Sequence, residues 1–220
     1  MLAERGYLIP AVNSSEVSYI RCAIQLAQSI HQHHPEANVC LLTNEQIDLP
    51  QFTHIVTLPH GDQGGFRNDW QVFDASPYRE TIKLEADMIL ASEFDHWWTM
   101  FEHRDMVISQ GCRDYHDRPS INRHYRKFID ENHLPDVYNA ITYWRLSKTA
   151  QEFFDLVRQI FQNWSEFRRL VKFSEDIAST DFVYAMAAEI LGRDRVTLPP
   201  GFGPTIVHMK SHIIGSPGAD

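Results

Sequence analysis

Apolar residues recur in short runs along the first half of the chain, and their spacing predicts alternating strands and helices. We expect a buried strand over residues 7–12, a helix over 17–30, and further strands over 38–43 and 53–58. In the helical segment the apolar residues fall three or four positions apart, as one face of a helix requires. Strand, helix and strand with short connections predict a βαβ unit and a parallel sheet, which binds ligands at the carboxyl ends of its strands.

The second half continues this alternation. Short apolar runs predict strands over residues 81–84, 105–109 and 137–144. A stripe of large apolar residues over 149–169 predicts a long amphipathic helix or a helix pair, and another helix is expected over 182–188. The pattern therefore indicates the α/β class, with a mixed, mainly parallel sheet between helices.

Two carboxylates, Glu85 and Asp87, follow the strand predicted over residues 81–84. Residues two apart in an extended chain point to the same side, so both carboxylates should converge at the carboxyl end of a buried strand. Their shared charge is costly there unless a cation or hydrogen bonds offset it, and a divalent metal ion that also neutralises phosphates is one candidate. The alternative is an ordinary solvated strand end, because so short a motif also occurs by chance.

Two further polar residues stand in apolar surroundings. Asn139 interrupts the strand predicted over residues 137–144, so its amide must be hydrogen-bonded, either within the protein or to a ligand. Asp181 follows Ser179 and Thr180 at the start of a predicted helix, where capping alone explains an acid in the first turn.

A third group of chemically active side chains lies near the C-terminus. His208, Lys210 and His212 alternate, so they would face one side if the segment is extended. An imidazole can ligate a metal ion and an ammonium group can neutralise a diphosphate. A solvated tail without a ligand is the alternative.

Length and composition narrow the class of protein. The chain has 220 residues with 43% hydrophobic content, so we expect one soluble domain over residues 1–220. No apolar run approaches the ~20 residues that span a bilayer, and no signal-peptide pattern is present, so we expect a cytosolic protein without a membrane partner. Three widely spaced cysteines are expected to be buried thiols. The oligomeric state cannot be inferred.

Charge argues in two directions. A formal net charge of −9 argues against nucleic-acid binding by the whole surface. Residues 113–127, however, interleave basic and aromatic side chains, which suits a surface that contacts phosphates, even those of a nucleic acid. A solvated, partly helical excursion is the alternative. The basic residues of this segment are Arg113, Arg118, Arg123, Arg126 and Lys127.

The segment SPYRETIKLEADMIL, residues 76–90, resembles a segment of the GT-A glycosyltransferases. In that family its D-x-D motif holds the metal ion and the diphosphate of a nucleotide-sugar. The resemblance implies that Asp87 ligates the metal ion and that Glu85, which replaces the usual Asp, faces ribose and metal.

Other segments resemble the same enzymes more loosely. The opening strand, polar loop and helix are similar to glycogenin-like and galactosyltransferase-like enzymes. This similarity implies that Ala11, Val12 and Asn13 line a uracil and ribose site. The strand around Asn139 resembles the family segment whose Asn faces sugar and acceptor, with Ile141 in place of a glycine.

Two more positions take roles from the resemblance. Asp181 matches the family's acid that reaches the sugar hydroxyls or the reacting centre. The tail looks like the family's H-x-x-G-x-x-K segment, which implies that His208 completes the metal site and that Lys210 contacts the β-phosphate. The spacing differs, and no glycine separates these two residues here.

Taken together, these features favour a GT-A fold and a metal-dependent glycosyltransferase that uses a nucleoside-diphosphate sugar, which we expect to be UDP-linked. Asp87, Glu85 and His208 would hold Mn²⁺ or Mg²⁺, and Lys210 would add positive charge. Asn139 and Asp181 would orient sugar and acceptor. The resemblance favours retention of the anomeric configuration.

The acceptor is left open by the sequence. The chain also resembles GT-A proteins of tailed bacteriophages, some of which glycosylate hydroxymethylated cytosines in DNA, so DNA in a host cytoplasm is one candidate. A protein, a saccharide or a small molecule is another. Two other functions stay in view, a nucleotide-sugar-binding protein without transfer activity and a metal-independent accessory protein that associates with DNA.

Overall fold

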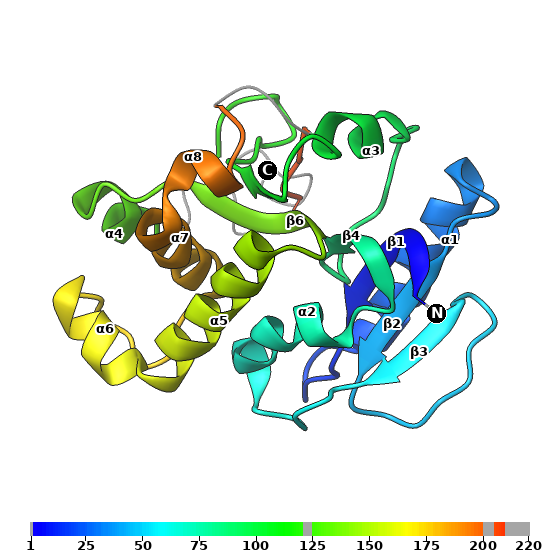
Figure 1. Cartoon of the computed structure of the whole chain (residues 1–220), viewed down its shortest axis with the longest axis horizontal. Coiled ribbons are helices and arrows are strands. Elements are labelled where there is room, and N and C mark those ends of the chain that lie inside the picture. The colour runs from blue at the N-terminus through cyan, green and yellow to red at the C-terminus, as the bar shows by residue number, and fades with distance from the viewer. Residues whose placement is uncertain (1, 121–124, 200–204, 210–220) are drawn as a thin grey trace.

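A six-stranded sheet with helices on both faces forms the framework of the protein (Figure 1). The computed structural model describes residues 2–120, 125–199 and 205–209. The strand order is β3-β2-β1-β4-β6-β5. The first four strands pair in parallel, whereas β6 runs antiparallel to its neighbours β4 and β5. The predicted α/β class and the mixed, mainly parallel sheet are thus confirmed.

The strands of this sheet are β1 (Ala3–Pro10), β2 (Val39–Thr43), β3 (His54–Thr57), β4 (Tyr78–Leu84), β5 (Met106–Gln110) and β6 (Val137–Arg145). The larger helices are α1 (Tyr19–His33), α5 (Lys148–Gln162), α6 (Trp164–Leu170) and α7 (Thr180–Leu191). The shorter ones are the 3-10 helix η1 (Gly65–Gln71), α2 (Val72–Ala75), α3 (His96–Phe101), α4 (Arg126–Glu131) and α8 (Arg193–Val196).

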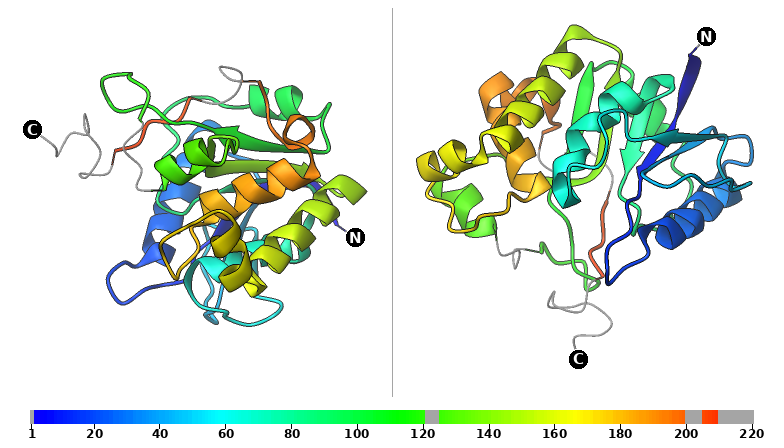
Figure 2. Two further views of the ribbon diagram at one scale, coloured as in Figure 1. Left: turned by 90° about the vertical axis from the view of Figure 1, so that its left-hand side faces the viewer. Right: turned by 90° about the horizontal axis from the view of Figure 1, so that it is seen from below.

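Alternation along the central strand β1 divides the core into two layers. Leu8 packs with residues of α2, α5 and α7 on one face of the sheet. Tyr7 and Ile9 point the other way, into a cluster with residues of α1 and α3. Figures 1 and 2 show these helices on opposite sides of the strands. Because both faces are covered, the central strands are apolar on both sides, as in other parallel sheets.

Several predicted boundaries shift for local reasons. The stripe over residues 149–169 is a helix pair, α5 and α6, which meet at Asn163. The first strand begins at Ala3 rather than near residue 7, because Ala3 and Arg5 pair with β4 although their side chains are not buried. Among the described residues no helix combines the length and the apolar character that crossing a bilayer requires. Cys40 and Cys112 are buried, Cys22 is half-buried, and none of the three is part of a disulfide.

One glycine in β1 is required by close packing. A Cβ atom on Gly6 would lie 2.5 Å from the ring of Tyr78, which is fully buried beside it on β4. We therefore expect Gly6→Ala to lower the free energy of unfolding by about 1–3 kcal/mol through overpacking. Urea denaturation measures this change. The same substitution should cost markedly less in a Tyr78→Leu background, and an equal cost in both backgrounds would contradict the packing explanation.

Candidate functional site

Most of the sequence-predicted residues meet at one edge of the sheet. The parallel strands β1 and β4 end there, at Pro10 and Leu84, and the antiparallel strand β6 begins there. The backbone N–H of Ala11 donates to Leu42 (2.8 Å), so the end of β1 stays attached to β2. The N–H of Glu85 donates to Ala140 (3.2 Å), which holds the end of β4 against β6. The nucleotide and carboxylate positions predicted from the sequence therefore share one edge.

Asn13 organises the loop between β1 and α1. Its side-chain oxygen accepts a hydrogen bond from the N–H of Ile20 (3.1 Å), in the first turn of α1. Its amide nitrogen donates to Glu45 (2.8 Å), in the loop after β2. Ala11 is buried, Val12 is half-buried and Asn13 is exposed. The side chain of Asn13 thus ties the start of a helix to a neighbouring loop, and its contact with a nucleotide stays a prediction.

Three carboxylates act on one tyrosine at this edge. Burial is the main cause that raises the pKa of the Tyr138 hydroxyl well above its usual value, and the negative charges of Glu85, Asp181 and Asp87 raise the pKa further. These carboxylates come from the end of β4 and from α7, so the fold brings distant acids within electrostatic range of one side chain. Glu85 is half-buried and Asp87 is exposed.

His208 reaches the same tyrosine from the end of the described chain. The Nδ1 atom of its imidazole shares a hydrogen bond with the hydroxyl of Tyr138. Backbone bonds fix its segment in place, because Arg113 donates to the carbonyl of Ile206 and His208 donates to that of Arg113, both at 2.8 Å. Residues 205–209 therefore lie along the loop that follows β5 (Figure 2). Lys210 and His212 lie outside the described residues.

Asp181 bridges α7 to the sheet. Its Oδ1 atom accepts a hydrogen bond from the backbone N–H of Asn139 (2.6 Å), and its Oδ2 atom accepts one from the hydroxyl of Tyr125. Capping of its own helix is one of the two explanations drawn from the sequence. It does not account for these two hydrogen bonds, which reach other elements. The Asp181 carboxylate holds the beginning of β6 in place, and a direct contact with sugar or acceptor stays a prediction.

We expect Asp181→Asn to lower the free energy of unfolding by about 1–3 kcal/mol, because charge-assisted hydrogen bonds between elements are lost. The matched control is Asp194→Asn, which also removes a first-turn acid, in the exposed helix α8. A helix-dipole effect alone is worth less than about 1 kcal/mol. If urea denaturation gives the same loss in the free energy of unfolding for both variants, Asp181 acts only as a charge at the end of its helix.

Behind the edge lies a buried polar network that the sequence did not predict. Lys83 of β4 is 2% exposed, and its ammonium group lies 3.0 Å from the Asp69 carboxylate of η1. Tyr184 of α7 donates a hydrogen bond from its hydroxyl to the Asp69 carboxylate. The side-chain amide of Asn139 also donates to this carboxylate, at 3.4 Å. Burial and the Asp69 charge raise the pKa of Tyr184 well above its usual value, and Glu85 adds to this. The network therefore extends to within electrostatic range of the Glu85 carboxylate.

The prediction that the side-chain amide of Asn139 must be hydrogen-bonded is confirmed. The residue is fully buried, and its side-chain oxygen accepts a hydrogen bond from Thr142 (2.6 Å) while its nitrogen faces Asp69. Its amide is thus engaged with protein groups. Whether it also orients a sugar stays a prediction. The sequence does indicate that an acid such as Asp69 must lie nearby. Lys83 stands between Ile82 and Leu84 in a buried strand, and a buried lysine requires an opposite charge.

The donor set at the edge has the right chemistry for a hard divalent ion, since it offers carboxylate oxygens and an imidazole. No group of three or more His, Cys, Asp or Glu side chains within the described residues is arranged to hold a metal ion. Magnesium sites at diphosphates commonly use only one or two carboxylates and take their remaining ligands from phosphate and water. The residues therefore fit an ion that arrives with a diphosphate better than a site built from protein alone.

Comparison with known proteins adds to this geometry. No protein-family model matches the chain, and no curated protein matches its sequence. The apo form of the glycosyltransferase GlyE from Streptococcus pneumoniae TIGR4 is similar in structure, with a TM-score of 0.53 and 14% identity over 90% of this chain. The galactosyltransferase LgtC in complex with donor and acceptor sugar analogues gives a TM-score of 0.53 and 10% identity over 82% of this chain. An active-site mutant of LgtC gives 0.51.

The protein has the GT-A glycosyltransferase fold. The aligned part covers 45% of the GlyE chain and 70% of the LgtC chain, so this protein corresponds to less than half of the former. The fold expected from residues 76–90 is thereby confirmed. At these identities the likeness concerns the fold, and the chemistry must be argued from the residues of this chain.

Proposed function

We propose that this protein is a metal-dependent glycosyltransferase that moves a sugar from a nucleoside-diphosphate sugar, with UDP as the nucleotide, to an acceptor hydroxyl. The observation that supports this proposal most is that His208 shares a hydrogen bond with Tyr138 while Glu85, Asp87 and Asp181 lie within electrostatic range of the same hydroxyl. These residues come from three separate parts of the chain, and they meet where parallel strands end in a GT-A fold. An ordinary solvated strand end would not bring acids and an imidazole close to one half-buried phenol.

The proposed roles follow exposure. Asp87 is exposed and so accessible to a metal ion with its diphosphate, whereas Glu85 is half-buried and nearer to the Tyr184 network. His208 would be the third metal ligand, with Tyr138 fixing the orientation of its ring through Nδ1. Ala11, Val12 and Asn13 would line the base and ribose, and Lys210, outside the described residues, would approach the diphosphate.

In the proposed reaction the acceptor hydroxyl oxygen attacks the anomeric carbon, the bond from that carbon to the nucleoside diphosphate breaks, and the hydroxyl proton is released to the departing diphosphate or to solvent. Bound Mn²⁺ or Mg²⁺ would supply Lewis-acid stabilisation of the departing diphosphate. The chain's own part is to hold the reactants. Asp181 and Asn139 keep the beginning of β6 rigid against α7, so the groups that face the donor stay in place.

DNA with hydroxymethylated cytosine is the acceptor that the bacteriophage resemblance favours, and residues 113–127 would supply the phosphate contacts. In the described part of this segment Arg118 pairs with Asp114 (2.9 Å), and Arg126 pairs with Asp130 (2.9 Å) and with Asp136. Those carboxylates reduce the charge available to phosphates. A metal-independent DNA-associated protein would instead bind duplex DNA in a salt-sensitive manner and would not respond to UDP-sugars. Measuring DNA binding at several salt concentrations, with and without UDP-sugars, therefore separates this function from sugar transfer.

The decisive test is a thermal-shift panel of UDP, UDP-sugars, GDP and ADP, each with Mn²⁺ or with EDTA. At about 100 times its dissociation constant a ligand stabilises the folded state by about 2.7 kcal/mol. For a chain of this size we expect UDP compounds with Mn²⁺ to raise the melting temperature by about 5–10 °C. Absence of a shift with every nucleotide at millimolar concentration would contradict the proposal. Release of UDP from the stabilising donor then distinguishes a transferase from a protein that only binds nucleotide-sugars.

A further inference from the structure

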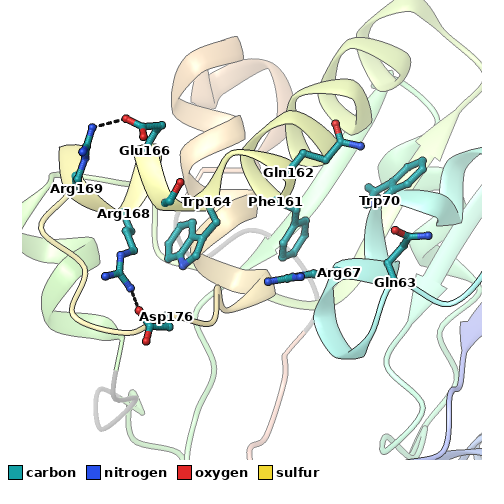
Figure 3. A pocket seen from close by; sticks show the side chains of 11 residues that line it. Gln63, Arg67, Trp70, Phe161, Gln162, Trp164, Glu166, Arg168, Arg169 and Asp176 are labelled. Atoms are coloured by element: carbon teal, nitrogen blue, oxygen red, sulfur yellow. Dashed lines mark hydrogen bonds and ion pairs between the residues drawn. The ribbon is translucent and has the colours of Figure 1, made fainter.

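A cavity lies between η1 and the helix pair α5 and α6 (Figure 3), and neither Glu85 nor Asp87 lines it. It has a volume of about 590 Å³, within the range of small-molecule sites. Gln63 and the 3-10 helix form one wall, the helix pair forms another, and Asp176 closes the side. We call it the basic cavity. The charged side chains that line it are Arg67, Arg168, Arg169, Glu166 and Asp176.

The charge of the basic cavity differs from that of the chain as a whole. Three arginines and two carboxylates line it, which leaves a net positive charge in a protein of net charge −9. Arg168 pairs with Asp176 and Arg169 with Glu166, but those carboxylates have side chains that are 91% and 63% exposed. Ion pairs of such exposed groups are weak. A ligand that carries its own anion can therefore displace them.

Arg67 is the group that points most directly to a ligand. Its guanidinium extends from η1 toward the side of the cavity where Phe161 and Trp164 lie (Figure 3). Its side chain forms neither an ion pair nor a hydrogen bond with the other described residues, whereas its backbone N–H donates to Gly64. In a 3-10 helix residues three apart share a face, so Arg67 and Trp70 both line the cavity while Asp69 turns toward Lys83. The same helix thus serves two separate sites.

The rest of the lining suits a carbohydrate. Gln162 and Ser165 are exposed and form no side-chain hydrogen bond with the other described residues, so they are available to hydroxyl groups. Trp70, Phe161 and Trp164 supply apolar edges, against which the C–H groups of a sugar ring can pack. The indole N–H of Trp164 already donates to the carbonyl of Glu175 (3.4 Å), and the residue is 6% exposed, so only an apolar edge of its ring faces the cavity.

We propose that the basic cavity binds an anionic saccharide, a sugar that carries a phosphate or a carboxylate group, with Arg67 and Arg168 on the anion. Polar side chains hold the hydroxyls and the aromatic edges hold the ring. Arginine suits this role because its planar fork matches phosphate and carboxylate oxygens in a bidentate manner. The site is distinct from the proposed donor site, and its ligand binds without a metal ion.

Calorimetric titration of the full chain at low ionic strength tests this proposal, with EDTA present and with four probes, glucose 6-phosphate, glucuronate, glucose and inorganic phosphate. We expect one of the two charged sugars to bind more tightly than both glucose and inorganic phosphate. Arg67→Gln should weaken that binding about tenfold to a hundredfold, as expected for lost hydrogen bonds to a charged group. Arg21→Gln, which removes an exposed arginine of α1, is the matched control and should leave the affinity unchanged.

A second variant changes the affinity in the opposite direction and so excludes misfolding as the cause. Asp176→Asn removes the carboxylate that competes for Arg168 and should tighten binding of the charged sugar about two- to fivefold. Equal affinities for all probes, binding of inorganic phosphate alone, or an affinity that Arg67→Gln leaves unchanged would each overturn the proposal.

Titration with UDP and Mn²⁺ separates this proposal from the proposed function. We expect Arg67→Gln to leave UDP affinity unchanged, and a parallel loss of UDP binding would assign the cavity to the donor site instead. If the charged sugar binds and UDP does not, the basic cavity stands and the transferase proposal fails. If UDP binds and no charged sugar does, the transferase proposal stands and the proposal for the basic cavity fails.

Discussion

Asp87→Ala is expected to abolish the Mn²⁺-dependent rise in melting temperature that UDP compounds give the unchanged protein. It is also expected to lower the rate of sugar transfer by about a hundredfold or more, because Lewis-acid stabilisation of a departing diphosphate is worth several kcal/mol. The Asp87 side chain is exposed and ends no helix or strand, so its removal should cost the fold little. Thermal shift with UDP and Mn²⁺, and release of UDP, measure the two effects.

The control for this prediction is Asp48→Ala, which removes another exposed carboxylate, in the loop before β3. Its melting temperature without ligand and its response to UDP should match those of the unchanged protein. A variant at Asp87 that still responds to UDP and Mn²⁺ as strongly as the control would show that the ion is held elsewhere.

Asp69→Ala is expected to lower the free energy of unfolding by about 3–5 kcal/mol, the largest stability change that we predict. Lys83 is 2% exposed and the Asp69 side chain is 14% exposed, so removal of the acid leaves a buried positive charge without its partner. Tyr184 and Asn139 lose an acceptor at the same time. Urea denaturation, with the slope against urea concentration checked for two-state behaviour, measures the loss.

The double variant Asp69→Ala with Lys83→Met provides the internal control. It removes the charge as well as its partner, and replacement of a buried ion pair by apolar groups is often neutral or stabilising. The double variant should therefore regain a large part of the lost stability. A double variant no more stable than Asp69→Ala alone would mean that hydrogen bonds to Tyr184 and Asn139, rather than the buried charge, set the cost.

The sequence predicts the site only where neighbouring positions determine direction. The alternation of β4 predicts that Glu85 and Asp87 point to one side, because the side-chain period of a strand is two. The strand ends at Leu84 and Asp87 lies in the turn that follows, so their shared direction stays a prediction. In the same way an Asn within an apolar strand must find a partner, and Asn139 does. These inferences need no knowledge of distant parts of the chain.

The buried network shows the limit of such inference. Lys83 requires an acid, but the chain contains 29 Asp and Glu residues, and local pattern does not select Asp69. Tyr184, which shares that acid, is 115 residues away from it in the sequence. The strand order is beyond local pattern for the same reason, because an apolar run carries no mark of its direction or of its neighbours.

The position of β6 has a consequence for how the protein can be synthesised and shortened. Although it is the last strand of the sheet in the sequence, it lies between β4 and β5. Any chain that stops before Val137 therefore leaves β4 and β5 each with an open edge inside what should be the core, and open apolar edges invite pairing with other chains. During synthesis this gap persists from the completion of β4 at Leu84 until Arg145 has been added, so the unfinished sheet is vulnerable to aggregation over that interval.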